Sequence, residues 1–445
     1  MRQLETVFEE IPFEDVEGMP EIKVTFSGCR LGSDRLGFDI VNFLEKKISR
    51  WTTLHFKALR GMETIRTQMI ARESSANKKK FDYLWAEASK MHAVHASPQG
   101  NLVVCTGNLH CGFCVLVIDT KLNRTLIFPE DFDSDIKLYS TTGGFTPDKE
   151  HWFFVRWPLD DALDILEGKM DMAKCEVGRF NLDTFEAEII YEMDNADNIH
   201  QITCSGDGRY LVIAPLKYDP KIPYPLVSLQ EDPLGYRRSH EAGLHKSELT
   251  TIDLKNNRHW RTEISVPVPA HFEFDPISPH IFYVSSHNFS LSLRDEIILE
   301  GPGAIIKMEI RDGETVAVGQ YSDEEFFRVT QHMPFCFEGR TLIAVTNFPD
   351  RLDIIDGQTM TLWHRHQMFP AEPLELNEIG NLVLSELPES CFSINPSTDG
   401  KYIVLESVAG MLIFDVANRK FLKQTVSRQI PTGFRGTGHA RPYGH

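Results

Sequence analysis

The sequence predicts an all-β fold, a seven-bladed β-propeller with helical and loop insertions on one face. The best-marked repeat runs from His200 to Ala214. Here Ile202 and Cys204 alternate with polar residues, a Ser-Gly-Asp-Gly turn follows, and an apolar stretch begins at Tyr210. This pattern is typical of two strands joined by a tight turn. Five further stretches repeat the design: 95–104, 145–154, 274–283, 335–343 and 394–403.

A second hairpin follows each of these repeats. It is entered through an apolar residue and then an acid or Asn, and it continues through a polar turn into another strand. The pairs are Ile118-Asp119, Phe180-Asn181, Ile252-Asp253, Met308-Glu309, Ile355-Asp356 and Phe414-Asp415, with Val41-Asn42 as a seventh near the N-terminus. Four strands in a period of about 40 to 50 residues indicate a propeller blade.

We therefore expect one domain over residues 1–445, with a Gly-rich C-terminal tail at 427–445. The predicted blades span about 22–54, 91–128, 138–191, 198–266, 269–321, 327–368 and 388–426. The first blade is one hairpin short, so a strand from either terminus is expected to complete it. Stretches that lack strand alternation are interpreted as insertions: a helix and loop at about 60–90, then interruptions near 158–168, 217–245 and 285–303.

Composition limits the classes of function. The apolar fraction of 42% and the charged fraction of 25% are ordinary for a globular protein. A net charge of −18 argues against a nucleic-acid or anionic-membrane partner, although a local basic pocket stays open. No stretch resembles a signal peptide or a membrane span, so a cytoplasmic location is expected. The eight cysteines suit reduced thiols, and most of them are expected as small buried groups in strands. The sequence sets no oligomeric state.

Polar residues recur where the first strand of each blade begins, at the face that also carries the insertions. They are His92, His200 with Gln201, His271, and Gln331 with His332. Aligned on the hairpin turn, His92 and His200 share one column, and His271 and His332 share the next. Residues in such columns come together around the propeller axis, and long loops on one face are usually there for binding.

Two interpretations of these histidines are open. In the first, His92, His200, His271 and His332 bind a divalent transition metal such as iron, manganese or zinc, with His271 and His332 as the catalytic residues. In the second, each His caps a strand and hydrogen-bonds to a neighbouring blade. Under the first, the residues expected to bind a small-molecule substrate are Arg156, Gln201, Arg237, Arg238 and Gln331.

The other motifs give weaker evidence about function. No Walker loop or dinucleotide fingerprint is present, so no nucleotide cofactor is expected. The Cys-x-x-Cys pair at Cys111 and Cys114 lacks a second pair and a thioredoxin context, and we interpret it as structural. The tail adds His439, Arg441, Tyr443 and His445, either as a lid over the channel mouth or as a loose terminus.

The repeated apolar-x-Ser/Asn/Thr-Pro-x-x-Gly-x-apolar hairpin, as at 96–102 and 394–402, is followed by Ile-Asp hairpins such as 252–258. Together they resemble seven-bladed propellers of the oligogalacturonate-lyase and YVTN-repeat type over residues 91–426. This resemblance implies the fold. Lyases of that type, like the carotenoid-cleaving oxygenases, hold a metal on axial histidines. From the axial histidines at the channel mouth, acting as metal ligands or as a general base, the function expected is a small-molecule enzyme of lyase, isomerase/cyclase or oxygenase type. The alternative is a non-catalytic protein-interaction platform.

Overall fold

A computed structural model describes the chain in segments that are almost entirely β-strand. The described residues are 2–4, 6–12, 23–30, 35–54, 91–96, 102–107, 115–128, 137–148, 150–158, 174–194, 201–213, 216–218, 245–264, 269–286, 289–291, 297–299, 303–323, 329–347, 351–368, 382–384, 391–407, 410–422, 426–427, 434–435 and 441–442. The chain divides into two compact units, Met1–Asp194 with Lys423–His445, and Asn195–Leu422.

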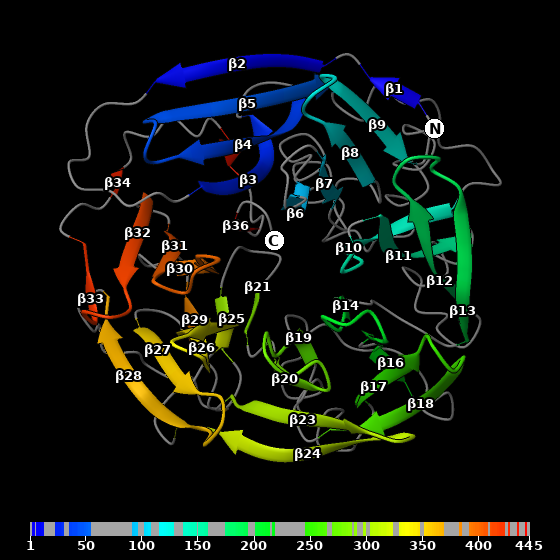
Figure 1. Cartoon of the computed structure of the whole chain (residues 1–445), viewed down its shortest axis with the longest axis vertical. Helices are drawn as coiled ribbons and strands as arrows, with labels where there is room; N and C mark the ends of the chain where they lie inside the picture. Colours follow the sequence, from blue (N-terminus) through cyan, green and yellow to red (C-terminus); the bar gives the residue numbers. More distant parts are fainter. Residues whose placement is uncertain are drawn as a thin grey trace. The chain divides into compact units, whose positions relative to one another are not determined.

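The first unit holds two sheets of four strands that are consecutive in the chain, and each is named here by its first strand (Figure 1). The β6 blade contains β6 (Met91–Ala96), β7 (Leu102–Gly107), β8 (Val115–Asp119) and β9 (Arg124–Phe128). The β10 blade contains β10 (Lys137–Phe145), β11 (His151–Pro158), β12 (Lys174–Asn181) and β13 (Ala187–Asp194). The short strand β1 (Arg2–Leu4) pairs with β9.

A third sheet of this unit is assembled from both ends of the chain. Its consecutive strands are β3 (Lys23–Arg30), β4 (Arg35–Asn42) and β5 (Lys47–Leu54). The fourth strand, β2 (Thr6–Pro12), precedes them in the chain and pairs with β5. On the other edge, β35 (Phe434–Arg435) and β36 (Arg441–Pro442) from the tail pair with β3. The tail also contains β34 (Val426–Ser427).

The second unit holds four more four-stranded blades in chain order. The β14 blade contains β14 (Ile202–Cys204), β15 (Tyr210–Ile213), β17 (His245–Asp253) and β18 (Arg258–Glu263), with β16 (Leu216–Tyr218) paired to β17. The β19 blade contains β19 (Pro269–Phe274), β20 (Ile281–Ser286), β23 (Ile305–Arg311) and β24 (Glu314–Tyr321). The β25 blade contains β25 (Val329–Phe337), β26 (Arg340–Asn347), β27 (Arg351–Asp356) and β28 (Thr361–Gln367). The β30 blade contains β30 (Cys391–Pro396), β31 (Tyr402–Ser407), β32 (Gly410–Asp415) and β33 (Lys420–Phe421).

These six blades confirm the predicted all-β class and the β-propeller arrangement. In three blades the second and third strands are separated by a long connection, as the sequence predicts. The connection of the β19 blade carries β21 (Phe289–Leu291) and β22 (Ile297–Leu299), which form a small sheet with β29 (Leu382–Leu384). The helix and loop expected at about 60–90, and residues 159–168 of the interruption in the β10 blade, lie outside the described residues. Within the described part no helix is long and apolar enough to cross a membrane.

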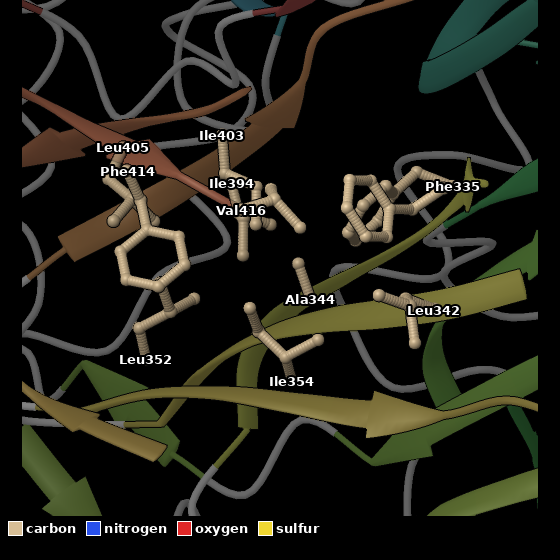
Figure 2. Close-up of a cluster of buried hydrophobic side chains, with 11 residues drawn as sticks. Phe335, Leu342, Ala344, Leu352, Ile354, Ile394, Ile403, Leu405, Phe414 and Val416 are labelled. Carbon is tan, nitrogen blue, oxygen red and sulfur yellow. The ribbon is translucent and has the colours of Figure 1, made fainter. Parts of the chain in front are cut away.

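Consecutive blades of the second unit pack face to face through apolar clusters. Between the β14 and β19 blades the cluster includes Val212, Leu249 and Phe282, and between the β19 and β25 blades it includes Tyr283 and Ile343. Figure 2 shows the cluster between the β25 and β30 blades, where Ile354, Phe414 and their neighbours meet. The first strands of these four blades also contact one another in order. Central strands are therefore buried on both faces, which explains their near-continuous apolar sequences, whereas the outer strand β18 alternates between exposed and half-buried residues.

The Asp or Asn that opens a second hairpin caps its turn, at Asn42, Asp119, Asn181, Asp253, Asp356 and Asp415. Asp253 accepts backbone hydrogen bonds from Lys255 and Asn256, and Asp356 does the same for Gln358 and Thr359. Such Asx turns compensate the backbone N–H groups that the turn leaves without ladder partners. Four positions after the acid or Asn the backbone enters the left-handed region, at Lys46, Asn123, Phe185, Asn257, Met360 and Arg419.

The first hairpin of the blade also repeats in detail. The Ser205 hydroxyl bonds to Asp207 and accepts from the Tyr210 N–H, and Ser397 has the same contacts with Asp399 and Tyr402. One expectation about these strands is wrong: Cys336 is exposed rather than buried. Side chains alternate across a strand, and its neighbours Phe335 and Phe337 occupy the buried face.

Candidate functional site at the first strands of the blades

A β-bulge marks the start of several first strands. The register shifts between Met91 and Ala93, between Pro269 and His271, and between Val329 and Gln331, and again at the start of β30. His92 is therefore a bulged residue, His271 comes one position after its bulge, and His332 comes two positions after. The predicted column shared by His271 and His332 is wrong, because His271 shares its register with Gln331. Since side chains alternate across a strand, His271 and His332 belong to opposite faces of their sheets.

The two glutamines of this register tie each blade to the next. The Gln201 amide donates to the Phe272 carbonyl oxygen at 2.8 Å and accepts from the Phe272 N–H at 3.2 Å. Gln331 accepts from the Ile394 N–H at 2.9 Å in the β30 blade. Both side chains are buried. An amide side chain that pairs with backbone in this way satisfies groups beside a bulge, where the ladder is interrupted.

His332 is fully buried and links its blade to the preceding one. Its Nε2 lies 3.1 Å from the Tyr283 carbonyl oxygen, and its Nδ1 lies 2.9 Å from the Ser285 hydroxyl. A carbonyl oxygen only accepts, so Nε2 carries the proton and Nδ1 accepts from Ser285. Both ring nitrogens are thereby engaged. This arrangement does not fit a metal ligand, which needs a free nitrogen lone pair.

His271 lies at the boundary between the same two blades. It is 4% exposed and stands opposite Ser285 in the β19–β20 ladder, so Ser285 is a cross-strand neighbour of His271 and a hydrogen-bond partner of His332. The structure therefore brings together the two histidines predicted as catalytic, at a buried boundary between blades.

The remaining predicted residues are spread. Arg156 donates through Nε to Glu176 at 2.7 Å and lies over the Phe154 ring, so it is engaged within its own blade. His92 belongs to β6, but its side chain is outside what the structure describes. His200, Arg237, Arg238, the Cys111–Cys114 pair and the tail residues His439, Tyr443 and His445 lie outside the described residues.

Sequence reasoning missed two polar groups at hairpin turns. Asp148, Glu150 and His151 offer ligand atoms within 4.8 Å of one another, the one such group in the described part of the chain. The Asp148 carboxylate is engaged by Thr146 and by the Glu150 N–H, as in the equivalent Ser205 turn, so the turn itself explains this group.

The second group joins the β25 and β30 blades. The Arg340 guanidinium carbon lies 5.3 Å from the Trp363 ring centroid, and that of Arg419 lies 4.1 Å from it. No sequence motif links these three residues, although Trp363 has a sequence signal: it stands seven residues after Asp356, as Trp260 does after Asp253.

Comparisons with known proteins add little. No known protein family matches the sequence, and no curated protein does either. Among solved structures, hydrazine synthase of Kuenenia stuttgartiensis is similar with a TM-score of 0.43 and 11% sequence identity, over 73% of this chain and 76% of that one.

Proposed function

We propose that this protein is a non-catalytic β-propeller that binds other proteins. The observation that supports it best is the use of the polar residues at the first strands: Gln201, Gln331 and His332 hydrogen-bond to groups of the adjoining blade. Hydrogen-bonding groups engaged in this way hold blades together and leave little for substrate chemistry. A rigid scaffold with long connections between strands is then suited to binding.

The same proposal includes seven blades in a single domain. The sheet of β2, β3, β4 and β5 has the strand number and antiparallel order of a blade, with its outer strand supplied from the N-terminus. Asn42 and Lys46 repeat the Asx turn and the left-handed residue of the other blades. We take this sheet as the seventh blade.

The alternative is an enzyme of lyase, isomerase/cyclase or oxygenase type acting on a small molecule. The placement of His271 and His332 at one boundary between blades favours this enzyme. The hydrogen bonds of His332 argue against a metal bound to that histidine. A metal in this alternative would depend on His271 with His92 and His200.

Metal analysis of the protein purified without an affinity tag separates the two functions. The variants are His271→Ala and, as a matched control, His280→Ala, which removes an exposed histidine of the same blade. We expect no stoichiometric metal in any of the three proteins. About one metal per chain in the wild type and in His280→Ala, lost from a folded His271→Ala protein, would contradict the platform.

A positive test of the platform is reconstitution. We expect a protein that co-purifies stoichiometrically with the untagged chain from its native source, and that re-forms the complex when both purified components are mixed. Failure to re-form the complex from pure components would argue against a direct partner.

A further inference from the structure

Two exposed arginines from neighbouring blades share one half-buried tryptophan. Arg340 begins β26 in the β25 blade, Trp363 lies on the outer strand β28, and Arg419 lies in the β32–β33 turn of the β30 blade. Cation–π attraction to an aromatic ring helps to hold a guanidinium in place, while its N–H groups, which lie in the guanidinium plane, remain able to donate. Two fixed guanidinium groups thus lie beside the same indole.

Nearby carboxylates are occupied by their own turns. Asp356 accepts from the N–H groups of Gln358 and Thr359 and from the Thr359 hydroxyl. Asp415 accepts from the backbone and side chain of Asn418. In the described part of the chain, neither Arg340 nor Arg419 forms an ion pair with a carboxylate.

The charge of Arg419 affects the pKa of a neighbouring histidine. Burial lowers the pKa of His364, the residue after Trp363, and the nearby charge of Arg419 lowers it further, against the opposing effect of Asp353. Among the arginines whose side chains the structure describes, Arg340 and Arg419 lack an ion pair with a carboxylate, in a chain whose net charge is −18. Burial raises the pKa of Asp356, but its turn hydrogen bonds and then the nearby charge of Arg340 lower it below its ordinary value, so this carboxylate is an acid that Arg340 is shown to affect. By contrast, Arg209 and Arg258 of the β14 blade form ion pairs, with Asp253 at 3.0 Å and Asp312 at 2.6 Å respectively.

We propose that Arg340, Trp363 and Arg419 form a binding site for an oxyanion, the carboxylates of an acidic segment of a partner protein. The inference rests on the proposed function as a binding platform and names the partner chemistry of one surface. Guanidinium groups bind carboxylates through paired N–H donors, and two of them side by side suit a segment with successive acidic side chains. A free phosphate offers the same oxygen chemistry.

The test is calorimetric titration with a hexaglutamate peptide and, separately, with inorganic phosphate, at ionic strengths of about 0.1 M and about 1 M. The test variant is Arg340→Gln with Arg419→Gln. The control is Arg258→Gln with Arg311→Gln, which removes the same charge from exposed arginines that have carboxylate partners. We expect the peptide to bind the wild type and the control, with affinity about tenfold weaker in the test variant and at about 1 M salt. Circular dichroism confirms that each variant is folded.

Three results would overturn the site. If peptide affinity falls equally in the control variant, the loss comes from the change in net charge and not from this site. Binding of phosphate without binding of the peptide would replace the acidic segment with a small phosphate ligand. Absence of both would remove the oxyanion site. Stoichiometric metal in the untagged protein would defeat the platform without changing this titration, so the two failures are distinguishable.

Discussion

The boundary between the β14 and β19 blades and the boundary between the β25 and β30 blades use equivalent tryptophans in different ways. Trp260 donates through Nε1 to the Thr315 hydroxyl at 2.8 Å, and Thr315 also bonds to Thr251. Trp363 instead lies beneath two arginines that come from both sides of its boundary. One repeat position therefore serves either as a polar link between blades or as a support for surface charge, and the neighbouring residues of both blades decide which.

The hairpin turns differ too, and the largest effect is expected at Gly400. Gly400 has a φ of +68°, and an added Cβ would lie 1.9 Å from the Cys336 carbonyl oxygen of the β25 blade. Gly400→Ala should therefore lower the free energy of unfolding by about 2–5 kcal/mol, from left-handed strain and a backbone clash combined. Gly339 has a φ of +78° with no atom within 4 Å of such a Cβ, so Gly339→Ala should cost only about 1–2 kcal/mol. Urea denaturation measures the loss of unfolding free energy in both variants. Equal losses would show that the backbone near Gly400 and Cys336 shifts to make room for the added Cβ.

A second difference lies inside the blades. Asp353 is fully buried, and its carboxylate accepts a hydrogen bond from Arg365 Nε at 2.7 Å. The equivalent residue of the β14 blade is Thr250. Asp353→Asn should lower the free energy of unfolding by about 1–3 kcal/mol, below the range for a broken buried pair, because Arg365 is 32% exposed and keeps its ion pair with Asp323.

Thr250→Val is the matched change in the β14 blade. The Thr250 hydroxyl has no hydrogen-bond partner among the described residues, so its removal should leave stability unchanged or slightly higher. A loss above about 1 kcal/mol in urea denaturation would show that the hydroxyl is satisfied in solution.

Thr315→Val tests the polar link at the β14–β19 boundary. The change removes the acceptor for Trp260 and the partner of Thr251, which are buried or half-buried. We expect a loss of about 1–3 kcal/mol in the free energy of unfolding. Trp260→Phe should then lower the free energy of unfolding by less in the Thr315→Val protein than in the wild type. If the losses of the two single variants simply add in the double variant, the link between Trp260 and Thr315 is refuted.

Local chemistry explains how much of this could be read from the sequence. The turns at Ser205 and Asp253 are formed by residues within a few positions of one another, so the repeats and the blade class were predictable. The β25–β26 hairpin closes through a two-residue turn between Phe337 and Arg340, whereas the β19–β20 hairpin has a longer turn between Phe274 and Ile281. This difference depends on how the strands pair, so alignment on the turn misplaced His332 relative to His271 by one position. The roles of Gln201 and Gln331 depend in the same way on the neighbouring blade, because their partners are backbone groups far away in the chain.

A further prediction concerns the pH dependence of stability at the β25–β30 boundary. His366 packs edge-on against Phe421, with ring centroids 4.8 Å apart, and His364 lies against Phe414. Burial lowers the pKa of both histidines, whereas the pKa in an unfolded chain is about 6.5. The unfolded chain therefore binds more protons as the pH falls below that value, and the free energy of unfolding should decrease there. The melting temperature should drop between pH 7.5 and 5, and a His364→Gln, His366→Gln variant should show a smaller drop than His280→Gln. Identical drops in the two variants would place the pH dependence elsewhere, while a smaller drop in the double variant would show that this boundary senses pH through the two histidines.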